Sequence, residues 1–298
     1  MTLQNSFDDF ILSRRLADLS PKTIKDYKEF ITPFIEFIGV DKDIETLNDK
    51  DINRYIAKLL DRPLTKSSRA TYIRHIKIYL RWMEKTIHID VKAEQIRVPK
   101  NPKRIVKIYS DEEIVKIFNA VQNGSEWVTY RNRCIIALMY DSGLRQSEVC
   151  TLRLKNVSFR NNRLVVYGKG NKERTVPLGE LTKRLMSAYM EKCPYVLENL
   201  MFLNNDGEPL TCNAVKLMVS KVASRLDFEL SSHKLRHNFA TNYCLDQYER
   251  YGQVDIYRLM IILGHEDVET TRIYLHLANE IIASRESISH LDKLKFIV

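Results

Sequence analysis

The stretch between about Ile87 and Ile108 divides this chain of 298 residues into two halves. Apolar residues recur at three- and four-residue spacing on both sides of it, but that periodicity fades inside it. Residues 97–104 hold two prolines and four cations without an acid, a composition that favours an extended backbone. We therefore predict two domains, residues 1–96 and 109–298, joined by a basic interdomain linker at residues 97–108.

The first half has the pattern of four helices, at about residues 7–16, 20–39, 48–60 and 66–85. Ser20 followed by Pro21 is a typical helix start, since serine caps the first turn and proline fits its first position. Gly39 is expected to end that helix, and Pro33 lies inside it as a candidate bend. The sequence predicts a small helical domain.

The fourth of these helices carries a cationic face opposite its apolar face. Glu84 is the only acid near it, and its cations are Arg74, Lys77, Arg81 and Lys85. An ordinary solvated face is one interpretation, but we favour a face that lies against phosphates. The formal net charge of +9 also suggests a polyanionic partner such as nucleic acid. In the linker, Lys100, Lys103 and Arg104 suit a segment that follows a DNA backbone.

Cysteine usage and hydropathy place the chain among reduced, cytoplasmic proteins. The five cysteines are odd in number and show no Cys-x-x-Cys spacing, so we expect free thiols and neither a disulfide frame nor a zinc site. No apolar run approaches the roughly 18 residues that span a membrane. We expect a soluble protein without a membrane partner.

The second half is expected to be mainly helical with a small antiparallel sheet. Ser110 and Glu113 form a capping box, and the strongly apolar helix at about residues 130–140 is the predicted core. Short β-type runs follow at residues 157–159, 164–167 and 174–177. The fold class is therefore mainly α with a small antiparallel β-sheet.

Two turns of this half present cations. Gly143 is a plausible left-handed helix cap that presents Arg145 at a helix junction, with Glu148 opening the next helix. A buried structural pair of Arg145 with Glu148 is the alternative. Lys169 lies at a hairpin tip between Gly168 and Gly170, so it is either solvated or able to approach a ligand.

The stretch from His233 to Tyr274 gathers further groups that suit phosphate chemistry. His233, Arg236 and His237 fall at i, i+3 and i+4 of one helix, and His265 follows a helix end at Gly264. A phenol with a pKa of about 10 is a weak nucleophile unless cations stabilise the group that it attacks. We therefore interpret Tyr274 as the nucleophile at a phosphodiester.

The chain ends in an apolar tail, residues 278–298, which needs a surface to bury it. It either folds onto its own domain or docks on a neighbouring protomer.

In this order, the motifs resemble the tyrosine recombinase (phage integrase) family. The matching segments are Ser-Gly-Leu-Arg-Gln-Ser-Glu at residues 142–148, the hairpin Lys169, His-Lys-Leu-Arg-His at residues 233–237, Leu-Gly-His at residues 263–265, and Thr-Arg-Ile-Tyr at residues 271–274. Residues 7–85 resemble the family's SAM-like, four-helix core-binding domain. The resemblance covers nearly the whole chain in the short, Xer-like two-domain form.

The resemblance implies a site-specific DNA recombinase that needs neither metal nor cofactor nor ATP. Tyr274 would attack the scissile phosphate and give a 3′-phosphotyrosyl intermediate, while Arg145 and Arg236 hold its oxygens. Lys169 would act as general acid and His265 as a hydrogen-bond donor. His233 would assist proton transfer or hold an oxygen, and Glu148 would orient the cations, so the expected catalytic set is Arg145, Lys169, His233, Arg236, His265 and Tyr274.

The expected partner is double-stranded DNA at specific inverted-repeat sites. The expected assembly is a homo-oligomer, a dimer on one site and a tetramer in synapsis, formed by exchange of the C-terminal tail. Integration or transposition of a mobile element is the favoured natural reaction, and Xer-like resolution of chromosome or plasmid dimers is the alternative. A type IB topoisomerase, a catalytically silent DNA-binding regulator and a phosphoesterase acting on small substrates are the other classes considered.

Overall fold

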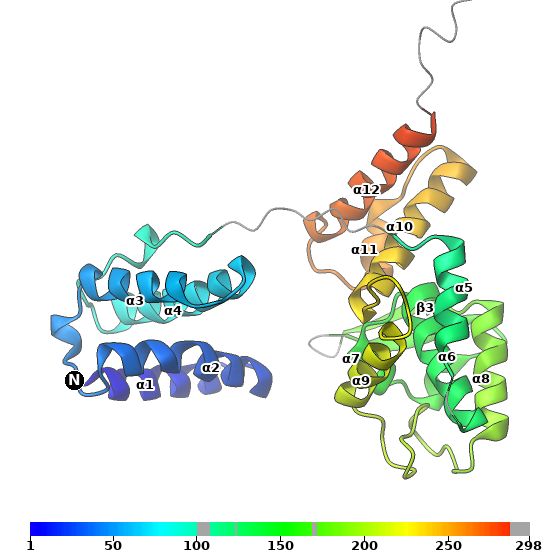
Figure 1. Ribbon diagram of the computed structural model, residues 1–298, viewed down its shortest axis with the longest axis horizontal. Helices are drawn as coiled ribbons and strands as arrows, with labels where there is room; N and C mark the ends of the chain where they lie inside the picture. The colour runs from blue at the N-terminus through cyan, green and yellow to red at the C-terminus, as the bar shows by residue number, and fades with distance from the viewer. Residues whose placement is uncertain (100–107, 123, 169–171, 287–298) are drawn as a thin grey trace, which may run out of the picture. The chain divides into compact units, whose positions relative to one another are not determined.

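The structure, a computed structural model, describes residues 1–99, 108–122, 124–168 and 172–286, without the side chains of the last two (Figure 1). It consists of two compact units, Met1–Arg104 and Ile105–Val298. The division between them lies inside the segment that the sequence assigns to the linker. Lys100, Lys103 and Arg104 lie outside the described residues.

The N-terminal unit is a bundle of four helices, as predicted. They are α1 (Leu3–Leu16), α2 (Pro21–Ile38), α3 (Asp49–Asp61) and α4 (Lys66–Thr86), with short 3-10 turns at Ile44–Thr46 and Ala93–Gln95. The Ser20 side chain caps α2 by accepting from the backbone N–H of Thr23, and Gly39 follows its last residue with φ of 111°. Asn48 and Asp51 form a capping box that starts α3.

An aromatic cluster at the centre of this bundle joins α1 to α4. The ring of Tyr79 packs edge-on against Phe10 at 5.3 Å between centroids, and its hydroxyl donates to Ser6 Oγ at 3.0 Å. Tyr79 and Phe10 are fully buried. A buried hydroxyl with a partner avoids the free-energy cost of an unsatisfied polar group, so this cluster fixes the helix pair in one register.

The C-terminal unit contains one small sheet surrounded by helices. Its elements are α5 (Asp111–Ala120), α6 (Glu126–Asp141), α7 (Gln146–Cys150), a 3-10 turn (Leu154–Asn156), β1 (Val157–Ser158), β2 (Arg163–Tyr167), β3 (Glu173–Pro177), α8 (Glu180–Lys192), α9 (Cys212–Ala223), α10 (Ser232–Tyr251), α11 (Ile256–Leu263) and α12 (Glu269–Glu286). The sheet is antiparallel in the order β1-β2-β3, with Val165 opposite Thr175. The predicted fold class is confirmed.

Helix α6 is the centre of this unit, packed between α8 and α10 (Figure 1). Residues 134–139 are all buried, as expected from a segment with no polar face. The helix begins at Glu126, about one turn before the predicted start, because Ser125 takes the N-cap position and Thr129 Oγ1 donates back to its carbonyl. That extra turn contains Trp127 and Val128, which pack in the core although the predicted helix left them out.

Helix α12 changes the interpretation of the C-terminal tail. The helix runs to Glu286 and packs against α10, so Tyr274 lies within it rather than before a tail. Ala278 is fully buried, and Ile281 and Ile282 pack against the same apolar cluster. The start of the predicted tail is thus covered by its own domain, and residues 287–298 lie outside the described residues.

Among the helices that the structure describes, none is both long and apolar enough to cross a membrane.

Leu138→Ala should lower the free energy of unfolding by about 2–5 kcal/mol, because Leu138 is fully buried in α6 and its truncation leaves a cavity. Leu217→Ala on α9 is the matched control, since Leu217 is 62% exposed, and its change should stay within about 0.5 kcal/mol. Chemical denaturation of the whole chain measures both. Equal effects of the two variants would contradict the central position of α6.

Candidate active site

The junction between α6 and α7 delivers Arg145 into a cluster of charged residues around Glu148. Gly143 there has φ of 65°, and a Cβ at this residue would lie 2.4 Å from a ring carbon of Phe239. Only glycine fits both the left-handed backbone and that close approach. The predicted left-handed turn is confirmed, and it places Arg145 at the N-cap of α7.

Arg145 is held on two sides and is still partly open to solvent. Its Nη1 donates to Glu148 Oε1 at 2.9 Å, and its Nη2 donates to the carbonyl of Gly264 at 3.0 Å. Its backbone N–H also donates to Glu148 Oε2 at 2.7 Å. The side chain keeps 36% of its surface exposed, so the guanidinium is oriented by the protein yet accessible to a ligand.

Arg236 lies on α10 and is almost completely buried. Its guanidinium donates to the carbonyls of Gly143 and Leu263, which belong to the two segments that flank the site. Burial and the charge of Arg145 lower the pKa of Arg236 to about 10, although Glu148 acts in the opposite direction. Arg236 therefore remains a cation at neutral pH.

His265 follows the left-handed Gly264 that ends α11, as the sequence predicted. Its Nε2 lies 3.3 Å from Arg236 Nη2, which can only donate, so the ring proton belongs on Nδ1. Nδ1 lies 2.9 Å from Thr271 Oγ1, a suitable acceptor. Burial, then the charges of Arg236 and Arg145, lower the pKa of His265 to about 4.

Tyr274 is buried between two imidazole rings. Its ring lies 5.2 Å from that of His237 and 6.3 Å from that of His265, centroid to centroid, and only 4% of the residue is exposed. Burial raises its pKa, while the charges of Arg236 and Arg145 act in the opposite direction. In the protein alone the phenol is therefore protonated at neutral pH.

His233 and His237 lie one turn apart on α10 with their rings 4.1 Å apart. His233 is exposed, whereas His237 is 8% exposed and lies against Tyr274. Burial, followed by His233 and Arg236, lowers the pKa of His237 to about 4. Both sides of Tyr274 are thus lined by neutral imidazoles.

Glu148 is the carboxylate at the centre of the group. Besides Arg145, it accepts two hydrogen bonds from Arg174 on β3, at 2.7 Å to Oε1 and 2.8 Å to Oε2. Burial alone would raise the pKa of Glu148, but the hydrogen bonds from Arg174 and Arg145 outweigh it and hold the pKa below its ordinary value. The carboxylate is ionised and fixed.

A cleft of about 630 Å³ opens at one side of this group. Arg145, Arg174 and His265 line it, together with Gly168 and Lys172 from the hairpin between β2 and β3. Lys172 Nζ lies 3.0 Å from Glu266 Oε1 across its edge. Lys169 itself lies outside the described residues, between those two hairpin positions. Within the described part of the chain, no three His, Cys, Asp or Glu side chains are grouped to hold a metal ion.

The cations predicted on α4 differ in their surroundings. Arg74 and Lys85 are exposed. Arg81 Nε lies 2.6 Å from Glu94 Oε1, and Lys77 donates to the carbonyls of Glu94 and Ile96, so both hold the segment after α4. Their contact with DNA stays a prediction.

The structure thus brings together Arg145, Glu148, His233, Arg236, His265 and Tyr274, and it adds groups that the sequence interpretation did not select. Arg174 and His237 are buried in contact with the predicted set, and Thr271 fixes the ring of His265. A signal for Arg174 existed: β3 alternates between exposed and buried residues, and Arg174 falls on the inward face with Val176. A charged residue on an inward face indicates a buried ion pair.

The site thus places a buried phenol between two imidazoles, close to guanidiniums that share one carboxylate. The profile of the Phage integrase family matches residues 107–280, and that of the family's N-terminal SAM-like domain matches residues 7–86. The chain belongs to the phage integrase family, and it is a site-specific tyrosine recombinase.

Relatives of nearly equal length support this assignment. The tyrosine recombinase XerC of Pediococcus pentosaceus is 28% identical over 293 residues, which cover 94% of this chain and 95% of the relative. XerC of Staphylococcus epidermidis is 29% identical over 270 residues, covering 88% and 89%. The resemblance inferred from the motifs is confirmed.

Solved structures share the fold at low sequence identity. A lambda integrase dimer bound to a core site has a TM-score of 0.73 at 19% identity, covering 92% of this chain and 95% of that chain. A XerH recombinase bound to its difH substrate has a TM-score of 0.68 at 21% identity, covering 89% and 79%. An integrase of the Tn1549 transposon, in complex with a circular intermediate DNA, has a TM-score of 0.74 at 16% identity, covering 96% and 100%.

The stability of the protein should fall as pH decreases from about 6.5 to 4, because His237 and His265 have pKa values near 4 when folded and about 6.5 when unfolded. Over that range the unfolded chain binds the protons and the folded chain does not, so unfolding is favoured. The denaturant midpoint is measured between pH 7 and pH 5, a range that lies above the pKa values of most carboxylates. At pH 5.5 the variant with both histidines replaced by glutamine should bind about two fewer protons on unfolding than the wild type does. An unchanged pH slope would contradict the neutral imidazoles.

Proposed function

We propose that this recombinase cleaves and rejoins DNA through a 3′-phosphotyrosyl bond to Tyr274. The observation that carries the proposal is the enclosure of the Tyr274 ring beside His265, which contacts Arg236 and lines one cleft with Arg145. The phenol oxygen attacks the scissile phosphorus, and the 5′-oxygen leaves as a hydroxyl. One phosphodiester is exchanged for another, so the reaction requires no ATP.

Arg145 and Arg236 are the cations that stabilise the phosphorane-like transition state. Their guanidiniums reach Gly264 and Leu263, neighbouring carbonyls on one segment, so the two cations converge there. A guanidinium forms paired hydrogen bonds with phosphate oxygens and remains charged throughout. Because both are fixed before the phosphate arrives, they stabilise the growing charge without reorganisation.

Lys169 is the proposed general acid for the departing 5′-oxygen. Lys169 is one of three residues between Gly168 and Lys172. Both of these flanking residues line the cleft. We therefore assign Lys169 to the same phosphate as Arg145. A proton donor is needed because an alkoxide is a poor leaving group.

The histidines divide the remaining tasks. His233 is exposed at the start of α10, where it assists proton transfer from Tyr274 or holds a phosphate oxygen. His265 accepts from Arg236 in the protein alone, so its proposed donation to phosphate requires the ring proton to be on Nε2. A phosphate that draws Arg236 toward itself would release that nitrogen.

Double-stranded DNA with inverted-repeat sites is the proposed substrate, bound mainly through its phosphates. The net charge of +9 and the exposed Arg74 and Lys85 of α4 support it. Such binding weakens steeply with salt, since each neutralised phosphate releases counterions. The relatives of nearly full length named XerC are compatible with the Xer-like alternative, beside integration of a mobile element, as the natural reaction.

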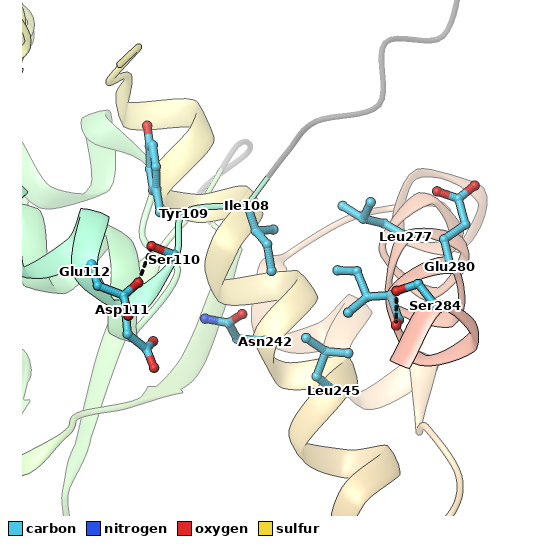
Figure 2. A pocket seen from close by; sticks show the side chains of 11 residues that line it. Ile108, Tyr109, Ser110, Asp111, Glu112, Asn242, Leu245, Leu277, Glu280 and Ser284 are labelled. Atoms are coloured by element: carbon cyan, nitrogen blue, oxygen red, sulfur yellow. Dashed lines mark hydrogen bonds between the residues drawn. The ribbon is translucent and has the colours of Figure 1, made fainter. Parts of the chain in front are cut away.

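The proposed oligomer is a dimer on one site and a tetramer in synapsis, joined by the C-terminal tail. Figure 2 shows a groove of about 620 Å³ between α10, α12 and the start of α5. Its apolar lining includes Ile108, Leu245 and Leu277, and acids from α5 and α12 stand at its rim (Asp111, Glu112 and Glu280). The tail, residues 287–298, combines apolar side chains with two lysines, so its composition complements this groove.

Tyr274→Phe should bind its DNA site with unchanged affinity but form no covalent complex with a nicked suicide substrate, because only the attacking oxygen is removed. Adduct formation is followed by denaturing gel electrophoresis. The wild-type chain is the positive control, and a plasmid relaxation assay run beside a two-site recombination assay separates this enzyme from a topoisomerase. A covalent adduct in the variant would rule out Tyr274 as the nucleophile, and no adduct in the wild type would favour a silent DNA-binding regulator.

Deleting residues 287–298 should leave binding to a single half-site intact and reduce synapsis, since the groove would then lack the tail of the neighbouring protomer. Gel-shift titration measures half-site binding, and formation of two-site complexes measures synapsis. Leu245→Lys in the groove should give the same loss, because a charge there opposes apolar docking. A recombination rate equal to that of the full chain in both variants would reject tail exchange.

A further inference from the structure

Arg174 is a buried arginine at the site to which none of these steps assigns a role. It lies on β3 with only 6% of its side chain exposed, and its guanidinium faces Glu148, which is 3% exposed. We propose that Arg174 is a positioning residue for strand cleavage. By binding the Glu148 carboxylate, it leaves Arg145 and Arg236 available to the scissile phosphate. This inference rests on the proposed function.

The distances around Glu148 show why an additional cation is needed. Arg174 donates to both carboxylate oxygens, at 2.7 and 2.8 Å, whereas Arg145 Nη1 reaches one of them at 2.9 Å. Arg236 Nη1 is 3.9 Å from Oε2, close enough to be attracted but not hydrogen-bonded. Arg174 therefore donates hydrogen bonds to Glu148 that Arg145 and Arg236 would otherwise have to supply. Without Arg174, the carboxylate would compete with the phosphate for those two guanidiniums.

Arg174 makes a second link, to the segment that carries His265. Its Nε donates to the carbonyl of Ile262 at 2.7 Å, near the end of α11. A Cβ on Gly264 would lie 3.0 Å from Arg174 Cδ, so the glycine leaves room for this arginine as well as adopting φ of 62°. The neighbouring carbonyls of Leu263 and Gly264 accept from Arg236 and Arg145.

The Arg174 side chain thus positions both Arg145 and Arg236, the pair that we call the cation clamp. Through Glu148 it sets the backbone and side chain of Arg145, and through Ile262 it sets the carbonyls that orient Arg236. A guanidinium suits this task because its planar fork binds the two carboxylate oxygens and still has Nε to donate elsewhere. A lysine ammonium would keep the charge but could not reproduce all three directed contacts.

Loss of Arg174 should therefore affect the chemical step more than DNA binding. In Arg174→Met, the unpaired Glu148 carboxylate would draw Arg145 and Arg236 toward itself and away from the phosphate. The rate of covalent adduct formation at saturating enzyme should fall by about 100-fold or more, comparable to the loss of one transition-state donor. The dissociation constant for the DNA site should change by less than about threefold.

The experiment compares variants on a suicide substrate with a normal scissile phosphate. Arg174→Met and Arg174→Lys are tested, with Arg174→Lys expected to fall between wild type and Arg174→Met. Arg131→Met is the matched control, because Arg131 is also buried and donates to the Leu203 carbonyl at 2.8 Å, away from this site. The folded fraction of the Arg131→Met variant should cleave the substrate at the wild-type rate.

A methylphosphonate at the scissile position distinguishes positioning from general structural damage. It replaces one charged oxygen by a methyl group, so the reaction depends less on the cation clamp. The loss caused by Arg174→Met should shrink by at least about tenfold on this substrate. Combining Arg174→Met with Glu148→Gln should be no worse than the worse single variant, since both changes act through one carboxylate.

Besides a fully active Arg174→Met variant, three results would overturn the proposal. One is an equal loss on phosphodiester and methylphosphonate. Another is a loss of DNA affinity as large as the loss of rate. The third is rescue by a 5′-thio leaving group, which departs without a proton, because Arg174 would then act on the general acid and not on the clamp. If the wild type forms no adduct at all, the proposed function fails instead. If the wild type forms an adduct and the Arg174→Met variant is fully active, only the positioning role of Arg174 is rejected.

Discussion

The site depends on one buried carboxylate that is shared among guanidiniums. Glu148 on α7 binds Arg145 on the same helix start and Arg174 on β3, and it attracts Arg236 on α10. Removing one partner of such a buried group costs about 3–5 kcal/mol, because the remaining charge is left without compensation. This single interaction therefore holds a helix, a strand and the end of α11 at fixed positions around the cleft.

Charge in the site is unbalanced in a way that favours a phosphate. Three guanidiniums surround one carboxylate, so the cluster carries an excess of positive charge beside the cleft. The same excess, together with burial, keeps His237 and His265 neutral and so avoids further repulsion. The phenol of Tyr274 is buried between these imidazoles with its pKa raised. An incoming phosphodiester would supply the missing anion where the nucleophile already lies.

Local signals in the sequence predicted the parts of the fold that depend on neighbouring residues. Ser20 with Pro21, the capping box of Ser110 with Glu113, and Gly143 all act within one turn of backbone, and each lies where it was expected. The start of α6 was missed although Trp127 and Val128 in its first turn are apolar, because the polar residues 131–133 separate them from the apolar run at residues 134–139. The extent of α12 was missed because its apolar residues fit a helix on its own domain as well as a docking tail.

The sequence by itself determined the family, because the order and type of the motif residues identify it whatever their distances. It also determined two domains, since an unpatterned, charged stretch cannot bury a core. Only the tertiary structure decided how each cation is held. Arg174, Arg145 and Arg236 are equivalent as charges in a sequence, but their hydrogen bonds to Glu148, Ile262, Gly264 and Leu263 give each of them a different set of partners. Burial made that distinction, and burial depends on contacts between residues far apart in the chain.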